Sequence, residues 1–263
     1  MPGSVIARVW AGVGRIMRRP GPAPAGPMAT PTSMPLPPTR LRAGGAHFRA
    51  DEDFMASAIL EARRVIAEAG SAHAVTILDL GCGAGRLAYG LIAIEAPIAR
   101  YEGVDVMAAQ IEWCVENVTP RHPGYRFQTI DVYNERYNRD GSRAVADAAL
   151  PLAGRSIDVA YAYSVFSHLQ TADVRAYLHE FARTLVADGV AFVTAFVEDD
   201  VADETVNPPD YQHESWGGPL HCVRFSRTHV EHMVREAGLT IDRFDYGQEA
   251  NGQSRLSLRV VAR

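Results

Sequence analysis

The stretch Asp79-Leu80-Gly81-Cys82-Gly83-Ala84-Gly85 decides the fold. It follows the apolar run Val75–Leu80 and precedes residues 86–95, whose apolar positions have helical spacing. Its glycines let the chain turn tightly and approach a ligand without Cβ clashes. The start of the helix offers free N–H groups and the positive end of a helix dipole. The stretch therefore predicts a strand, a ligand-binding glycine loop and a helix in succession.

Outside this loop, strand and helix patterns alternate. Strands are expected at 75–80, 100–106, 125–132, 156–163, 189–197, 239–246 and 254–262, and helices at 53–69, 86–95, 108–117, 171–186 and 228–237. Such alternation favours parallel pairing through right-handed crossovers. Only the turn 247–253 joins the last two strands, and it is too short for a parallel crossover. The sequence predicts an α/β fold, a Rossmann-like doubly wound seven-stranded sheet that is mostly parallel with an antiparallel C-terminal strand.

The N-terminal part of the chain has a different composition. Residues 1–50 contain seven arginines and no acid, and residues 20–38 contain eight prolines, which favours an extended linker. The apolar spacing within residues 1–19 fits a basic amphipathic helix on a membrane, an organelle transit peptide, or a tail upstream of a start at Met28 or Met34. We expect residues 1–46 to form a disordered extension and residues 47–263 to form one domain.

Charge and cysteine content exclude several classes of protein. All 26 basic residues are arginine, and those beyond residue 50 number 19 against 31 acids. An acidic domain is a poor candidate for sequence-independent nucleic-acid binding. Three scattered cysteines indicate a reducing compartment, and no apolar run is long enough to span a bilayer. We therefore expect a cytoplasmic protein with no nucleic-acid partner and no stable membrane insertion.

Three acids follow the ends of successive strands. Asp79, two residues before the first glycine, can pair with a cationic amino group and would be an odd neighbour for a pyrophosphate. Asp105 can accept both hydroxyls of a ribose, and Asp131 can take the amino group of an adenine. All three lie at carboxyl ends of strands, where open α/β sheets bind ligands. The third glycine also comes one residue too early for a dinucleotide fingerprint.

These residues resemble the class I S-adenosylmethionine-dependent methyltransferases. Residues 77–88 look like the first motif of that family, and residues 156–169 resemble its fourth-strand motif. Residues 177–193 are similar to the pattern before the fifth strand, with Asp188-Gly189 where the family usually has two glycines. The terminal hairpin matches the reversed last strand of the family, which nicotinamide-binding Rossmann domains lack. The resemblance covers about residues 47–263 and implies a methyltransferase with S-adenosylmethionine as cofactor.

The resemblance also implies where each part of the cofactor lies. The methionine part would be surrounded by Asp79, Gly81, Gly83 and Gly85. The ribose and one side of the adenine would contact Asp105, Val106 and Met107. The adenine edge would contact Asp131 and Val132, and the sulfonium would lie above Ser164 and Phe166.

A methyl acceptor needs orientation, and a hydroxyl acceptor also needs a base. His168, after the fourth strand, is the predicted catalytic base, although a histidine here can also cap or pack the next helix. Residues 198–225 are too long for a simple connection and are expected to form a lid-like insertion, with a solvated loop as the alternative. Substrate contacts are expected from Tyr133, His213, Trp216 and His221, with Asn134 and Tyr137 as weaker candidates.

The leading hypothesis is a small-molecule O-methyltransferase acting on a sugar, polyketide or phenolic hydroxyl. N-methylation of a small amine and a non-catalytic cofactor-binding protein are the alternatives, because the loop and the three acids fit all of them. The acids of residues 199–204 are interpreted as solvated, so no bound metal is expected. A homodimer is compatible with the sequence and is not specified by it.

Overall fold

The computed structural model describes residues 34–43, 45, 48–70, 73–213 and 216–261, and the expectations for residues 1–33 lie outside this range. Residues 34–43 pack on the domain. The Tyr89 hydroxyl donates to the carbonyl of Pro35 at 2.6 Å, and Gln110 Nε2 donates to the carbonyl of Leu41 at 2.9 Å. The predicted domain start at residue 47 therefore falls inside the packed unit, which extends back to Met34.

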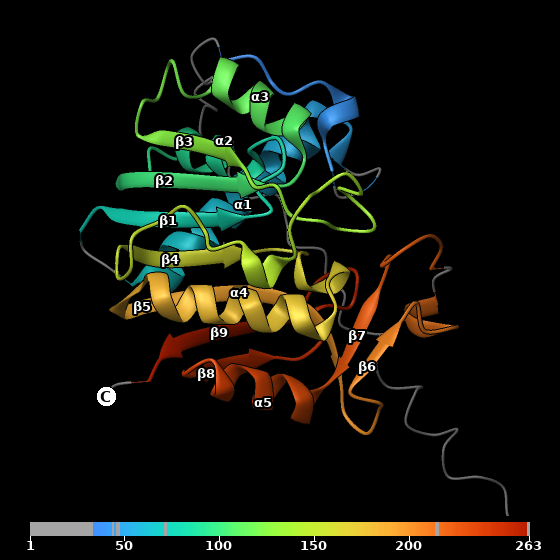
Figure 1. Ribbon diagram of the computed structural model, residues 1–263. Helices are drawn as coiled ribbons and strands as arrows, with labels where there is room; N and C mark the ends of the chain where they lie inside the picture. The colour runs from blue at the N-terminus through green and yellow to red at the C-terminus, as the bar shows by residue number, and fades with distance from the viewer. Residues whose placement is uncertain (1–33, 44, 46–47, 71–72, 214–215, 262–263) are drawn as a thin grey trace, which may run out of the picture. The chain divides into compact units, whose positions relative to one another are not determined.

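One sheet contains all nine strands of the described chain (Figure 1). They are β1 (Val75–Leu80), β2 (Ile98–Asp105), β3 (Tyr125–Thr129), β4 (Ile157–Ala162), β5 (Leu185–Glu198), β6 (Glu204–Val206), β7 (Val223–Ser226), β8 (Leu239–Asp245) and β9 (Ser254–Val260). β3, β2, β1, β4 and β5 are parallel neighbours in that order. β9 is antiparallel to both β5 and β8, which confirms the mostly parallel sheet with a reversed last strand.

The insertion at 198–225 supplies two strands that the sequence pattern did not predict. β5 continues past its pairing with β9, and residues 196–198 pair in parallel with residues 224–226 of β7. β6 then pairs antiparallel with β7. The sheet thus has nine strands rather than the predicted seven. These two strands have only three and four residues, too few for a clear alternation of apolar and polar positions.

Five α-helices cover the two faces of the sheet: α1 (Asp51–Ala69), α2 (Arg86–Ala93), α3 (Ala108–Asn117), α4 (Thr171–Thr184) and α5 (Arg227–Glu236). Buried side chains of α1, α2 and α3 belong to one apolar core, and those of α4 and α5 belong to the other. α1 begins with three acids, which favour the positive end of its dipole, and ends at Gly70 in a left-handed conformation. No helix in the described ranges has the length and apolarity to cross a membrane.

The order of the strands determines where along the sheet a ligand can bind. β1 has β2 on one side and β4 on the other, so the connections leaving β1 and β4 run in opposite directions across the sheet. At such a switch point the loops diverge and leave a crevice outside the carboxyl ends of the strands. The glycine loop follows β1 at this point, between β1 and α2.

Candidate active site

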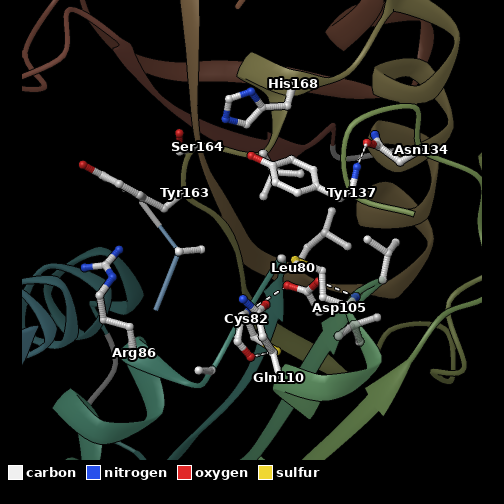
Figure 2. Close-up of a pocket in the computed structure, with 18 of the residues that line it drawn as sticks. Leu80, Cys82, Arg86, Asp105, Gln110, Asn134, Tyr137, Tyr163, Ser164 and His168 are labelled. Atoms are coloured by element: carbon white, nitrogen blue, oxygen red, sulfur yellow. Dashed lines mark hydrogen bonds between the residues drawn. The ribbon is translucent and has the colours of Figure 1, made fainter. Parts of the chain in front are cut away.

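A cavity of about 260 Å³ opens at this switch point (Figure 2). The carboxyl ends of three strands reach it through Leu80 of β1, Asp105 of β2 and Tyr163, which follows β4. Other walls come from the segment 42–54, from the loop after β3 and from the turn between β8 and β9. The cavity therefore lies where the sequence predicted the cofactor.

The glycine loop takes a backbone shape that few residues other than glycine adopt. Gly81, Gly83 and Gly85 have φ values of 75°, 53° and 81°, in the left-handed region. The backbone N–H groups of Gly81 and Cys82 both donate to the carbonyl of Val104 on β2, at 2.7 and 3.2 Å. Gly81 and Gly83 line the cavity, whereas Gly85 packs toward Cys114 behind it. At Gly81 and Gly83 the loop thus offers backbone rather than side chains to a ligand.

Asp105 is the acid that the structure brings into the cavity. Its Oδ2 accepts a hydrogen bond from the N–H of Gly83 at 2.8 Å, and its Oδ1 accepts one from the N–H of Met107 at 2.9 Å. Burial raises the pKa of this carboxyl, and the backbone N–H groups oppose that shift. Each carboxylate oxygen can accept a second hydrogen bond. Asp105 is therefore held in place with capacity left for the two hydroxyls of a ribose.

Apolar side chains continue the cavity beyond Asp105. The predicted residues Val106, Met107 and Val132 line it, together with Ile130. Such a surface next to an anchored carboxylate suits a flat adenine ring attached to the ribose. The anchored carboxylate, the glycine loop and the apolar wall are the kinds of group that S-adenosylmethionine needs for its ribose, its methionine part and its adenine.

Asp79 does not line the cavity. Its carboxyl is buried behind the loop and accepts a hydrogen bond from the Tyr101 hydroxyl. Burial raises its pKa to about 7, while the Tyr101 hydrogen bond and the charge of Arg86 act in the opposite direction. The contact of Asp79 with the amino group of the ligand stays a prediction, and in the structure its carboxyl is bonded to Tyr101 of β2.

Two further predicted cofactor residues also lie away from the cavity. Asp131 is exposed, and its carboxylate accepts hydrogen bonds from both the N–H and the hydroxyl of Ser142. Phe166 is buried and stacks on Phe181 of α4, with 6.2 Å between ring centroids. Neither side chain lines the cavity, so their contacts with adenine and sulfonium stay predictions.

Ser164 lines the cavity in a constrained conformation. Its φ is 56°, its N–H donates to Thr194 Oγ1 at 2.7 Å, and its hydroxyl accepts from Gln253 Nε2 at 2.9 Å. Gln253 Oε1 in turn accepts from the Thr194 hydroxyl at 2.8 Å. Ser164 is thus a left-handed residue held by two hydrogen bonds, whose partners Thr194 and Gln253 are bonded to each other, and it forms a fixed wall next to Tyr163 and Val165.

His168 lines the cavity from the short 3-10 helix Phe166–His168 (Figure 2). Its Nδ1 lies 3.0 Å from the carbonyl oxygen of Leu220. A carbonyl only accepts, so Nδ1 carries the hydrogen and Nε2 carries the lone pair. Burial lowers the pKa of His168 to about 4; the hydrogen bond to Leu220 opposes this shift, and the nearby charge of Arg136 adds a smaller lowering. His168 is thus a neutral imidazole at ordinary pH.

The predicted substrate residues divide into two groups. Tyr133, Asn134 and Tyr137 line the cavity, and the Tyr137 ring meets the His168 ring edge to face at 5.5 Å (Figure 2). Trp216 and His221 pack on each other with 5.3 Å between ring centroids, and neither lines the cavity. The side chain of His213 lies outside what the structure describes.

The insertion 198–225 therefore reaches the site through its backbone. The carbonyl of Leu220 holds His168, and the carbonyl of Pro219 accepts from Arg136 NH1 at 3.2 Å. None of its described side chains lines the cavity, and a lid over the acceptor stays a prediction.

Several lining residues had no role in the sequence analysis. Arg42 and Phe48 come from the segment before α1, and Gln110 comes from α3. Arg86 begins α2, and Asn251 lies in the terminal turn. Arg86 had a usable signal, because it directly follows the glycine loop. The others had none, because their approach depends on packing between segments distant in sequence.

Comparisons with known proteins agree with the site. Residues 46–243 match the family described as "Methyltransferase domain". A Burkholderia thailandensis 1,6-didemethyltoxoflavin-N1-methyltransferase, solved with its substrate and S-adenosylhomocysteine, has 18% identity and a TM-score of 0.54 over 81% of this chain and 80% of its own. The mitomycin 7-O-methyltransferase MmcR has 18% identity and a TM-score of 0.54 over 81% of this chain and 58% of its own.

The fold also occurs with another chemistry. The [4+2]-cyclase SpnF has 15% identity and a TM-score of 0.56 over 78% of this chain and 82% of its own. At such identities the solved structures show the shared fold, and the match to the family covers most of the chain. With its glycine loop and Asp105 at the switch point, the chain belongs to the methyltransferase-domain family and is a class I S-adenosylmethionine-dependent methyltransferase.

Proposed function

We propose that this methyltransferase acts on a hydroxyl group of a small aromatic molecule, with His168 as the base. The observation that carries the proposal is the orientation of His168. The Leu220 carbonyl fixes the hydrogen on Nδ1, so Nε2 is the atom that can accept a proton in the cavity. Among the described side chains that line the cavity, His168 is the neutral nitrogen base.

On the cofactor side the chain mainly binds and orients. S-adenosylmethionine supplies an activated methyl group when bound, so the protein needs to hold the acceptor in line and keep water out. Asp105 binds the ribose hydroxyls of the donor, and the backbone of Gly81 and Gly83 lets the donor approach closely. Ser164, held by Gln253 and Thr194, fixes the wall of the cavity between donor and acceptor.

On the acceptor side the walls are aromatic. Tyr133 and Tyr137 line the cavity with half-exposed rings, which suits a flat ring that enters from solvent. In the transfer, the acceptor oxygen forms a bond to the methyl carbon, the carbon–sulfur bond breaks toward sulfur, and the hydroxyl proton passes to His168 Nε2. A pKa of about 4 makes His168 a weak base, so an acidic phenolic hydroxyl suits it better than a sugar alcohol.

The same low pKa favours one second candidate, N-methylation of a small amine. A neutral amine attacks with its own lone pair and loses a proton only after transfer, so a weak base is sufficient. The support for a hydroxyl is the placement of Nε2 in the cavity, and the support for an amine is the low pKa of His168.

The proposed partner is a small molecule rather than a nucleic acid, because the chain beyond residue 50 is strongly acidic. The proposed compartment is the cytoplasm, in line with three buried free thiols among the described residues. A homodimer stays a prediction that light scattering on the purified chain checks.

The experiment compares matched acceptors with one trideuteromethyl-labelled donor. Pairs of phenol and aniline with the same ring are offered to the wild type and to His168→Ala, and labelled products are identified by mass spectrometry. Label on phenols that falls at least about 100-fold in His168→Ala supports the hydroxyl reaction. Label on anilines alone, at equal rates in both proteins, contradicts it and leaves the amine reaction.

A further inference from the structure

A chain of hydrogen bonds behind the cavity wall ends at the hydroxyl of Ser164. The N–H of Ser164 donates to Thr194 Oγ1 at 2.7 Å, and the Thr194 hydroxyl gives its single hydrogen to Gln253 Oε1 at 2.8 Å. This bond fixes which end of the buried Gln253 amide is the oxygen, so Nε2 is the atom 2.9 Å from Ser164 Oγ. An amide nitrogen only donates, and Ser164 Oγ therefore accepts this bond.

Ser167 determines where the hydrogen of Ser164 points. The two Oγ atoms are 3.2 Å apart, and by geometry either could be the donor. Ser167 is fully buried, and among the described residues its hydroxyl has Ser164 as its one hydrogen-bond partner. If Ser164 donated to Ser167, the hydrogen of Ser167 would be buried without an acceptor, which costs free energy. Ser167 is therefore the donor.

This accounting leaves the hydrogen of Ser164 for a ligand. A hydroxyl has two lone pairs and one hydrogen, and Gln253 and Ser167 occupy both lone pairs of Ser164. Ser164 lines the cavity, so its hydrogen is available there to an atom that accepts. The left-handed φ of 56° and the bond to Thr194 hold the residue in this position.

His168 offers the opposite polarity four residues further along the chain. The Leu220 carbonyl holds its Nδ1 hydrogen, so its Nε2 is an acceptor. Both side chains line the cavity, and Figure 2 shows them on the far side of it from Asp105. An acceptor molecule placed between them meets one group that takes a hydrogen and one that gives a hydrogen.

We propose that the acceptor is an aromatic hydroxyl with a carbonyl group on the neighbouring ring carbon, and that Ser164 donates a hydrogen bond to this carbonyl oxygen. The proposal rests on the hydroxyl reaction proposed above. In the transfer the hydroxyl oxygen bonds to the methyl carbon, the carbon–sulfur bond breaks toward sulfur, and the hydroxyl proton passes to His168 Nε2. The carbonyl oxygen, which only accepts, faces Ser164.

The weak basicity of His168 favours the same class of acceptor. Burial lowers the pKa of His168 to about 4, so the hydroxyl that it deprotonates needs to be acidic. A carbonyl conjugated with the ring withdraws charge from the hydroxyl oxygen and makes it more acidic. A hydrogen bond from Ser164 to the carbonyl strengthens this withdrawal, because it stabilises the negative charge that develops on the carbonyl oxygen. A second hydroxyl could also accept from Ser164, but it would not withdraw charge in this way.

The test compares three phenols in the wild type and in Ser164→Gly, which removes the hydroxyl at a φ that glycine adopts without strain. The phenols are ortho-acetylphenol, para-acetylphenol, which keeps the carbonyl but moves it away, and ortho-ethylphenol, which has a similar shape without the oxygen. The preference for ortho-acetylphenol over the other two, measured as kcat/KM, should be at least about 10-fold larger in the wild type than in Ser164→Gly. The affinity for S-adenosylhomocysteine should be the same in both proteins.

Calorimetry with the same phenols, on protein saturated with S-adenosylhomocysteine, measures the contact without turnover. Ser164→Ala also removes the hydroxyl and covers the case that Ser164→Gly fails to fold. Ser156→Ala is the matched control, because this hydroxyl lies just before β4, at the opposite end of that strand, and donates to the carbonyl of Ala153. It should keep the preference of the wild type.

The outcomes separate this contact from the hydroxyl reaction itself. An equal preference for ortho-acetylphenol in the wild type and Ser164→Gly, in both turnover and binding, would overturn the assignment. A loss of S-adenosylhomocysteine affinity in Ser164→Gly with no change in that preference would also overturn it, because the hydroxyl would then serve the cofactor. A wild type that binds ortho-acetylphenol with a preference dependent on Ser164, yet methylates none of the phenols, would support the contact and contradict the hydroxyl reaction.

Discussion

Gly81 lies directly against Val165, so that a Cβ atom added to Gly81 would stand 2.5 Å from Val165 Cγ2. This contact joins the glycine loop after β1 to the loop after β4. The backbone of Gly81 packs on the side chain of Val165 at the wall of the cavity. The two loops can come this close because residue 81 has no side chain. The left-handed φ of 75° adds a second reason for glycine.

Gly81→Ala should weaken cofactor binding at least about 10-fold and destabilise the fold by roughly 1–3 kcal/mol, because Val165 must move and the backbone is strained. Calorimetry with S-adenosylhomocysteine and thermal unfolding measure the two effects. Gly124→Ala is the matched control, since nothing lies within 4 Å of its added Cβ. If Gly81→Ala bound S-adenosylhomocysteine as tightly as the wild type, the close packing of Gly81 on Val165 would not be required for cofactor binding.

Asp105→Asn should weaken binding of S-adenosylhomocysteine about 10- to 100-fold, because an amide oxygen accepts hydrogen bonds less strongly than a carboxylate and its NH₂ group repels the backbone donors. Asp131→Asn serves as the control, because Asp131 is exposed and bonded to Ser142. Asp131→Asn should bind S-adenosylhomocysteine with the affinity of the wild type. A larger loss in Asp131→Asn than in Asp105→Asn would restore the adenine contact expected from the sequence.

His168→Ala should slow methyl transfer to a hydroxyl by about 100-fold or more while leaving S-adenosylhomocysteine affinity unchanged. Because the pKa of His168 is lowered to about 4, its Nε2 stays unprotonated from about pH 5 upward. The kcat of the wild type should therefore show no step due to His168 between about pH 6 and pH 8. A step near neutral pH that disappears in the variant would show that this pKa is wrong.

Asp79 should make stability depend on pH. Its pKa is about 7 in the fold against about 3.9 for an aspartate in an unfolded chain, so between these pH values the fold holds a proton that the unfolded chain has released. The free energy of unfolding should therefore fall as pH rises through this window, by up to roughly 4 kcal/mol. Asp79→Asn cannot ionise, so its melting temperature relative to wild type should rise from about pH 5 to about pH 8. A difference in melting temperature between Asp79→Asn and wild type that stays constant over this pH range would contradict the raised pKa of Asp79.

The sequence predicted most of the regular structure because long periodic segments and glycine turns are local signals. Asp105 lines the cavity, since an acid at the end of β2 projects where the sheet binds ligands. Asp79 does not line it, for a geometric reason. Side chains alternate along a strand, and its neighbour Leu80 takes the position that faces the cavity, while Tyr101 on β2 meets Asp79.

The remaining errors come from contacts that no local pattern encodes. β3 ends at Thr129, earlier than predicted, and the chain then turns so that Asp131 meets Ser142. Residues 34–43 lie in the extension 1–46 for which the sequence predicts disorder, yet the backbone carbonyls of Pro35 and Leu41 accept hydrogen bonds from Tyr89 and Gln110. Prolines prevent regular ladders, but they do not prevent an extended segment from packing through its carbonyl groups.

The most direct measurement uses trideuteromethyl-labelled S-adenosylmethionine in a host metabolite extract, with wild type and Gly81→Ala side by side. The account predicts a labelled compound in the small-molecule fraction, formed by the wild type and strongly reduced in the variant. Label confined to protein or nucleic acid, or no transfer by a wild type that calorimetry shows to be loaded with cofactor, would contradict the account.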